Sequence, residues 1–387
     1  MAFAANPAAA APKIAIVADY TEPYIDLDPS AEYSNGIRVL QNIYETLTRY
    51  DASTQKLEPL LAESWSVSPD GKTWTFEIRR GVKFHDGADL DAAAVKGSIE
   101  RTINMKKGAA YIWDAVQKIE TTGDFTVVFT LDRAAPVDLI ASAAYAAFII
   151  SPKAVDKGGD WFNEGTSDGG TGPYTLSGVQ RGEQAIMKKF DGYWRGWSEG
   201  QIDGVIIKKY SENSSRRLLI EKGEAQITNM LSTSDLKALK ENPSITVYEA
   251  PSWRNIIGFW NTEKPPLDNA DLRRALNYAY PYDEVITNVL EGRGVVSKGI
   301  VPSGLWGHDD TLDQPVFDME RAEEYLKKSG VDPSSVKLEA TIISGSEVYR
   351  SAMQIYRANL RKLGIEINVR EMTWDSLWEK SKSESPA

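Results

Sequence analysis

The chain has 387 residues, more than one hydrophobic core usually serves, so two or three domains are expected. Its 55 acidic and 44 basic residues give a formal net charge of -11, which argues against nucleic acid and anionic membrane surfaces as partners. The chain has no cysteine, which excludes disulfides and thiolate chemistry, and no apolar run reaches the ~20 residues that span a bilayer.

The N-terminal segment MAFAANPAAAAPK lacks the basic start and apolar stretch of a signal peptide. The tripeptide at 2–4 is similar to the small-residue end of a cleavage site, so we interpret the chain as a nearly mature exported protein with an added Met. A disordered Ala/Pro tail with no export history is the alternative. A first strand is predicted at 13–17, and Tyr20, Glu22 and Tyr24 follow at its exit.

The stretch 60–87 predicts a β-hairpin. Trp74, Phe76 and Ile78 alternate with polar residues, the period of two that marks a half-buried strand. The segment 69–71, Pro-Asp-Gly, precedes this strand and has the residues that a tight turn needs.

A helix and a further strand are predicted after the hairpin. Asp89 is placed to cap the helix, in which apolar residues recur at helical spacing. The segment 125–131 alternates again, with its apolar residues on one face. We therefore expect one compact α+β unit between Asp51 and about Trp161.

Glycine is densest at 165–174, where the sequence reads GTSDGGTGPY. This pattern fits neither G-x-x-x-x-G-K-[ST] nor G-x-G-x-x-G, so phosphate binding has little support. Further elements are predicted toward the C-terminus: strands at 202–210, 338–343 and 365–369, and helices at 214–222, 319–328 and 348–363. The last strand–helix–strand series is a βαβ pattern, typical of a parallel sheet.

The sequence motifs give little support for an enzyme. The sequence has no G-x-S-x-G elbow and no H-E-x-x-H. Its two histidines, His85 and His308, each lie in a turn motif far apart in sequence, which argues against a metal site or a catalytic triad. A glycosidase-type carboxylate pair remains open by count alone, but no spacing supports one. We therefore assign no catalytic residue, metal or cofactor.

Several motifs occur in an order that resembles a known family. The hairpin reads S-W-x-x-S-x-D-G-x-x-W-T-F-x-I-R-x-G-V-x-F-H-D-G, and N-x-Y-E-x-L, G-T-G-P-Y and Y-W-x-G lie outside it, at 42–47, 170–174 and 193–196. This series resembles the extracytoplasmic solute-binding proteins of ABC importers, family 5, which bind oligopeptides, dipeptides or nickel chelates. The resemblance covers most of 14–378.

The resemblance implies an α/β fold of the two-lobed periplasmic-binding-protein class, type II-like, with an extra α+β domain inserted in the first lobe. Lobe I is expected at 12–50 and 170–251, the inserted domain at 51–169 and lobe II from 252 to 387. The two lobes are expected to close on a ligand in hinge fashion.

A solute-binding function follows from the resemblance. The first choice of ligand is a short peptide, the second an oligosaccharide or glycoside, and the third a nickel complex, because histidine is scarce. The protein is expected to act as a monomer in the periplasm or at the cell surface, and to deliver its ligand to ABC permease subunits at the membrane. A hydrolase is the disfavoured alternative from another class.

Candidate ligand contacts lie at strand exits and linkers, where a two-lobed binder lines its cleft. For each aromatic among them, packing in a core is an equally open interpretation. The candidates are Tyr20, Glu22, Tyr24, Tyr111, Trp113, Tyr210, Trp253, Asn255 and Trp260.

The resemblance also implies that the second lobe continues past the strand at 365–369 and that the chain then returns to the first lobe. Only 18 residues follow Val369. We therefore expect this chain to be truncated at its C-terminus, without the family's W-x-x-D-Y-like segment.

Overall fold

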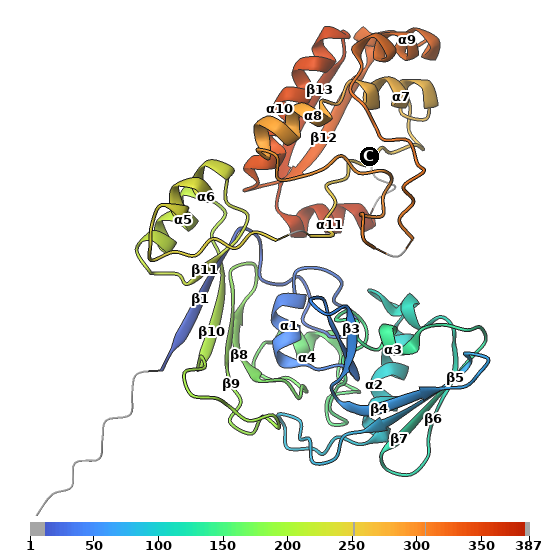
Figure 1. Ribbon diagram of the computed structural model, residues 1–387, viewed down its shortest axis with the longest axis vertical. Helices are drawn as coiled ribbons and strands as arrows, with labels where there is room; N and C mark the ends of the chain where they lie inside the picture. Colours follow the sequence, from blue (N-terminus) through green and yellow to red (C-terminus); the bar gives the residue numbers. More distant parts are fainter. Residues whose placement is uncertain (1–11, 251, 306, 384–387) are drawn as a thin grey trace, which may run out of the picture. The chain divides into compact units, whose positions relative to one another are not determined.

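The computed structural model describes residues 12–250, 252–305 and 307–383 (Figure 1). The tripeptide at 2–4, interpreted above as the end of a cleavage site, lies outside these residues. No helix within the described stretches is long and apolar enough to cross a membrane.

The chain forms two compact units. The first runs to Lys209 and takes up Ala225–Ile227 again, and the second takes Tyr210–Glu224 and the chain from Thr228 onward. Each unit has its own hydrophobic core, and the first has two.

A five-stranded mixed sheet organises one half of the first unit, in the order β11-β1-β10-β9-β8. Its strands are β1 (Ile14–Asp19), β8 (Tyr174–Gln180), β9 (Gln184–Lys189), β10 (Gly204–Lys209) and β11 (Ile227–Thr228). The β1 and β10 strands run parallel, side by side (Figure 1), whereas β9 is antiparallel to both β8 and β10. Helix α1 (Ile37–Ile43) contacts β8 and buries Val39, Leu40 and Ile43 in the core of this half.

The other half of the first unit is an antiparallel sheet in the order β4-β5-β7-β6. Its strands are β4 (Ala62–Val67), β5 (Thr73–Ile78), β6 (Val116–Thr121) and β7 (Thr126–Leu131). The predicted hairpin is confirmed, because β4 pairs with β5 across the turn that contains Gly71, and Trp74, Phe76 and Ile78 point into the core. Helix α2 (Ala92–Met105) packs against β6 and β7.

The predicted cap of this helix is wrong by two residues. The N-cap of α2 is Asp91, whose carboxylate accepts a hydrogen bond from Ala94 N at 2.7 Å. Asp89 instead forms an ion pair with Lys83 at 2.6 Å. The remaining elements of the first unit are short: β2 (Thr48–Asp51), β3 (Lys56–Pro59), the 3-10 turn Ala110–Trp113, α3 (Val137–Ile140) and α4 (Gly159–Asn163).

The second unit contains the βαβ pattern that the sequence predicts. Strands β12 (Lys337–Ile343) and β13 (Glu366–Met372) pair in parallel, and α10 (Glu347–Lys362) connects them. The apolar faces of α7, α9 and α10 share one core with this sheet. The other helical elements are α5 (Asn213–Glu221), α6 (Thr233–Lys240), α7 (Ala270–Tyr278), α8 (Tyr282–Glu284), the π-helical turn Val285–Val289, α9 (Met319–Ser329), the 3-10 turn Pro333–Ser335 and α11 (Trp374–Ser383).

The lobe boundary expected at 251/252 stays a prediction. Helices α5 and α6 lie in the second compact unit, and α6 contacts later parts of the chain. Thr233 Oγ1 donates to Val289 O at 3.2 Å, and Lys237 pairs with Glu291. The expected inserted domain at 51–169 stays a prediction, although the two cores of the first unit are compatible with it.

Candidate functional site

The candidate site begins where the two parallel strands of the first unit end. In the β1–β10 pair, Asp19 lies opposite Lys209, so both strands reach the same edge of the sheet with a charged residue. Ligands of open α/β sheets bind outside the carboxyl ends of parallel strands. The loop 20–24, which leaves β1 at this edge, is therefore the part of the first unit best placed to meet a ligand.

Asp19 and Arg38 form an ion pair at the start of this loop. The Asp19 side chain is fully buried and contacts Arg38 Nη1, and its second oxygen accepts from Thr21 N at 3.2 Å. Burial lowers the pKa of the Arg38 guanidinium from its ordinary value. Because each charge has the other as its partner, the pair anchors the loop to the start of α1.

Glu22 is held by its backbone and by one oxygen of its side chain. Its carbonyl accepts from Asn35 Nδ2 at 3.0 Å and from Arg38 Nη2 at 3.1 Å. Its Oε1 accepts from Lys209 Nζ at 2.8 Å. Its Oε2 is buried and, among the residues that the structure describes, has no hydrogen-bond donor. An acceptor in this state is uncommon, because buried polar atoms are nearly always hydrogen-bonded.

Tyr24 carries a second unpartnered polar atom in the same loop. Its side chain is buried in the core of the five-stranded sheet, and in the described chain its hydroxyl has no partner. Burial raises the pKa of the Tyr24 phenol. Two buried groups with open hydrogen-bonding capacity therefore lie within three residues of each other.

The loop that follows is shaped by a buried carboxylate. Glu32 accepts from the backbone N–H groups of Asp26 at 3.0 Å and Gly36 at 3.2 Å, and from that of Ser34. Burial raises the pKa of the Glu32 carboxyl to about 7, although these three donors act in the opposite direction. The bend places Asn35 and Arg38 where they bind the Glu22 carbonyl.

Asp28 connects the same loop to the antiparallel half of the unit. Its carboxylate accepts two hydrogen bonds from Arg101 of α2, at 2.6 and 2.7 Å. Both side chains are almost completely buried. A bidentate pair of this kind fixes orientation as well as distance, so the loop is rigid where it meets α2.

Three of the sequence motifs converge on one buried carboxylate, that of Glu45. Its oxygens accept from Thr171 Oγ1 at 2.9 Å, from Tyr193 OH at 3.0 Å and from Trp194 Nε1 at 2.8 Å. Burial raises the pKa of the Glu45 carboxyl, and the three donors partly offset the rise. The motifs N-x-Y-E-x-L, G-T-G-P-Y and Y-W-x-G thus meet in a structural joint.

His85 completes this joint from the hairpin motif. One ring nitrogen contacts Asp168 Oδ1, and the other lies 2.8 Å from Gly172 O. Asp168 also accepts from Gly170 N at 3.0 Å and Leu176 N at 2.9 Å. We call the residues around Glu45 and His85 the motif joint. Its polar side chains bind one another, so it positions elements and leaves little for a ligand.

Two aromatic candidates in one 3-10 turn have different environments. Trp113 is 1% exposed, lies in the core of the antiparallel half and donates from Nε1 to Ala146 O at 2.8 Å. This burial fits the core-packing alternative, but Trp113 and Tyr111 line the same surface pocket, and a ligand contact at Trp113 stays a prediction. Tyr111 is 59% exposed and lines a surface pocket of about 380 Å³.

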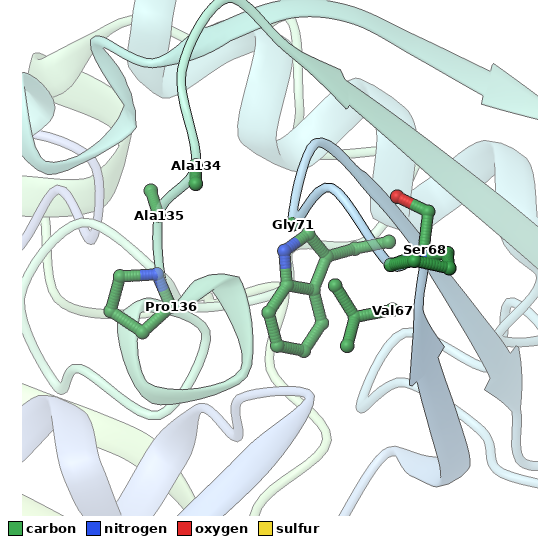
Figure 2. Close-up of a pocket in the computed structure, with 8 residues that line it drawn as sticks. Val67, Ser68, Gly71, Ala134, Ala135 and Pro136 are labelled. Atoms are coloured by element: carbon green, nitrogen blue, oxygen red, sulfur yellow. The ribbon is translucent and has the colours of Figure 1, made fainter.

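Figure 2 shows a second surface pocket, of about 460 Å³. Val67, Ser68 and Gly71 of the β4–β5 turn lie on one side of it, and the Ala134–Pro136 segment lies on the other. None of the nine candidate residues lines this pocket.

The remaining candidates lie in the second unit, apart from the half-buried Tyr20 at the β1 exit. Tyr210 is half-buried, at the start of that unit. Trp253 is 42% exposed, in a segment without regular secondary structure. Asn255 donates to Ile300 O at 2.7 Å, and Trp260 donates to Asn277 Oδ1 at 3.1 Å. Their role as ligand contacts stays a prediction.

Metal chemistry has no cluster to support it in the part of the chain that the structure describes. No three His, Asp or Glu side chains gather there in a way that could hold an ion. What the arrangement offers instead is a rigid loop with acceptor and donor atoms at a strand exit, which suits reversible binding of a polar solute.

The sequence matches the family described as bacterial extracellular solute-binding proteins, family 5, over residues 56–386. The chain belongs to this family. It is 29% identical to the dipeptide-binding protein of Escherichia coli K12 over 367 residues, which cover 88% of this chain and 68% of that protein. It is 30% identical to a probable D,D-dipeptide-binding periplasmic protein of the same organism over 374 residues, which cover 94% and 71%.

A solved structure supports the fold of this family 5 protein. The oligopeptide-binding protein AppA of Bacillus subtilis, in complex with a nonapeptide, superposes with a TM-score of 0.86 at 19% identity, over 96% of this chain and 77% of that one. The predicted two-lobed binding-protein fold is thereby confirmed. Family membership also confirms that the chain is a solute-binding protein and not an enzyme.

The charged partners at the β1 exit were missed by sequence reasoning. Asp19, Asn35, Arg38 and Lys209 were not among the candidates, although Glu22 and Tyr24 were. One signal was available, since Asp19 closely follows the predicted strand at 13–17 and Lys209 lies near the end of the predicted strand at 202–210. Pairing those strands in register would have placed Asp19 beside Lys209.

Proposed function

We propose that this family 5 protein captures a short peptide and delivers it to an ABC permease. The observation that carries the proposal is the loop at the β1 exit, which is rigid, polar and unsaturated in hydrogen bonds at Glu22 and Tyr24. The relatives support it. Two of them are named as dipeptide-binding proteins, one of these as probable, and the similar solved structure of AppA contains a nonapeptide.

A peptide fits the chemistry of this loop for a physical reason. Every peptide carries backbone N–H and C=O groups that lose their water on binding and need partners in the site. The Glu22 carboxylate and Tyr24 hydroxyl have capacity for such partners, and Tyr20 belongs to the same loop. The exposed aromatics Tyr111 and Trp253 are proposed to contact peptide side chains.

The setting of this activity is proposed from the family. The protein acts in the periplasm or at the cell surface, as a monomer, and its partners are permease subunits at the membrane. Trp113, Tyr210, Asn255 and Trp260 are kept as proposed ligand contacts. Closure of the two lobes on the ligand stays a prediction.

Native mass spectrometry of the purified protein, followed by calorimetric titration, tests this proposal. Di-, tri- and pentapeptides of alanine are compared with maltotriose and with a nickel–histidine complex. Peptides are expected to bind, to raise the melting temperature through preferential binding to the folded state, and to be recovered intact. Binding of the sugar without any peptide binding would overturn the peptide assignment. Stoichiometric cleavage of a peptide would overturn the assignment as a binder.

A further inference from the structure

Glu22 has two carboxylate oxygens in different situations. Oε1 accepts from Lys209 Nζ at 2.8 Å, whereas Oε2 has no donor among the described residues. The residue is 4% exposed. A carboxylate has about four lone-pair sites, two on each oxygen, so both sites of Oε2 are unused at a buried position.

The neighbouring donors already have other acceptors. Arg38 contacts Asp19 through Nη1, and it donates to Glu22 O through Nη2 and to Asn35 O through Nε. Asn35 donates through Nδ2 to the Glu22 carbonyl at 3.0 Å. A donor for Oε2 taken from Arg38 or Asn35 would break a bond that holds the loop, so neither of these groups is free to supply it.

We infer that Glu22 selects ligands by accepting a hydrogen bond from a ligand ammonium group at Oε2. The inference rests on the proposed peptide-binding function and adds which chemical group of the ligand this position recognises. A charged donor is favoured over a neutral one, because it adds a Coulomb attraction between opposite charges to the hydrogen bond. A ligand carboxylate at this point would meet like charge and be rejected.

Lys209 makes the inference testable in two directions. It is the only cation paired with Glu22 in the described chain. A ligand ammonium therefore shares the carboxylate with Lys209 and is repelled by it. Loss of the Glu22 charge should weaken binding of an ammonium ligand, whereas loss of the Lys209 charge should strengthen it.

The test is calorimetric titration of the full chain and its variants with four dipeptides. Ala-Ala and N-acetyl-Ala-Ala differ in the α-ammonium, and Ala-Lys and Ala-norleucine differ in a side-chain ammonium. The wild type is expected to prefer one ammonium peptide over its neutral partner by about tenfold or more, the size of one charge-assisted hydrogen bond. The pair that shows the preference identifies which ammonium is bound.

Variants then test whether Glu22 and Lys209 cause the preference for an ammonium peptide. Glu22→Gln keeps the size of the side chain and should remove the preference, while Lys209→Met should increase it several-fold. Glu183→Gln changes an exposed glutamate before β9 and should leave it unchanged. Circular dichroism confirms folding, and the opposite sign for Lys209→Met keeps the test independent of a general loss of structure.

Three outcomes would overturn the inference. If Glu22→Gln weakens all four peptides equally, Glu22 is structural and a water or backbone group occupies Oε2. If the wild type binds peptides without regard to either ammonium, the inference fails and peptide binding stands. If the wild type binds none of the peptides, both the inference and the proposed function fail.

Discussion

The motif joint and the β1 exit are both buried and polar, but their hydrogen bonds are not equally complete. In the joint, Glu45 accepts three hydrogen bonds, and Asp168 accepts from His85 and two backbone N–H groups. At the exit, Glu22 and Tyr24 each keep an atom that has no hydrogen-bond partner among the described residues. The motifs that identify the family therefore lie where the scaffold is assembled, and the groups with capacity for a ligand lie outside them.

The largest effect is expected from breaking the joint at Asp168. The Asp168→Ala change leaves His85 and the N–H groups of Gly170 and Leu176 without their acceptor in a buried place. We expect the free energy of unfolding to fall by about 3–5 kcal/mol, since each unsatisfied buried donor costs about 1–3 kcal/mol. Urea denaturation measures this. Asp191→Ala, at a side chain that is 95% exposed, is the control and should change little. Equal stabilities of the two variants would contradict the structural role of the joint.

Ionisation of Glu32 is expected to change the free energy of unfolding by about 3 kcal/mol at most. Its pKa is about 7 in the folded protein and near 4.5 when unfolded, so between these values the folded state holds a proton that the unfolded state releases. Its contribution to stability is therefore complete below pH 4.5 and is lost as the pH rises through 7.

The Glu32→Gln variant removes this titration. Between pH 5 and pH 8, the free energy of unfolding of the wild type should fall relative to that of the variant. The exposed Glu63→Gln variant serves as the control and should show no such trend. A wild type that gains stability relative to Glu32→Gln over this range would show that the three backbone donors outweigh burial.

Local patterns in the sequence predicted the elements well where one face of an element is buried. The alternation at Trp74, Phe76 and Ile78 gave the hairpin strand, and the spacing near the C-terminus gave the β12–α10–β13 unit. The cap of α2 was misplaced because Asp89 and Asp91 both suit a helix start. In the structure, Asp89 pairs with Lys83 next to an isolated β-bridge, whereas Asp91 accepts from Ala94 N, and helical spacing alone does not separate these two roles.

Long-range pairing explains what the sequence left open at the site. Glu22 and Lys209 are 187 positions apart, and nothing local predicts that they form an ion pair. Tyr111 and Trp113 are aromatic residues of the same short segment, and the sequence suggested both as ligand contacts on the same ground. In the structure, Tyr111 is 59% exposed and Trp113 is 1% exposed. Which of two aromatics in a 3-10 turn faces the core is decided by the sheet and helix packed against it.

A loss of binding without a loss of stability is the expected result at Trp253. Its side chain is 42% exposed, so Trp253→Ala should leave the melting temperature nearly unchanged. If it contacts peptide, its removal should weaken binding by roughly 1–3 kcal/mol, as at other aromatic contacts. Phe259→Ala, at a residue of the same segment that is 86% exposed, is the matched control. A large drop in melting temperature with unaltered affinity would place Trp253 in the core instead.

The smallest effects come from two tyrosine hydroxyls, and they compare the two regions most directly. Tyr24 at the β1 exit and Tyr44 are both almost completely buried. Within the described ranges, the Tyr44 hydroxyl has a hydrogen bond to the backbone of Gly169, and the Tyr24 hydroxyl has none. Tyr44→Phe should therefore cost about 1 kcal/mol of unfolding free energy, the usual value of one hydrogen bond. Tyr24→Phe removes a polar atom that has no partner and should be neutral or slightly stabilising in the same urea titration. If the Tyr24 hydroxyl binds ligand, this variant should lose peptide affinity while keeping full stability, and Tyr44→Phe should do the reverse. Equal losses of stability in both variants would mean that the Tyr24 hydroxyl is satisfied in solution and that the β1 exit is as closed as the motif joint.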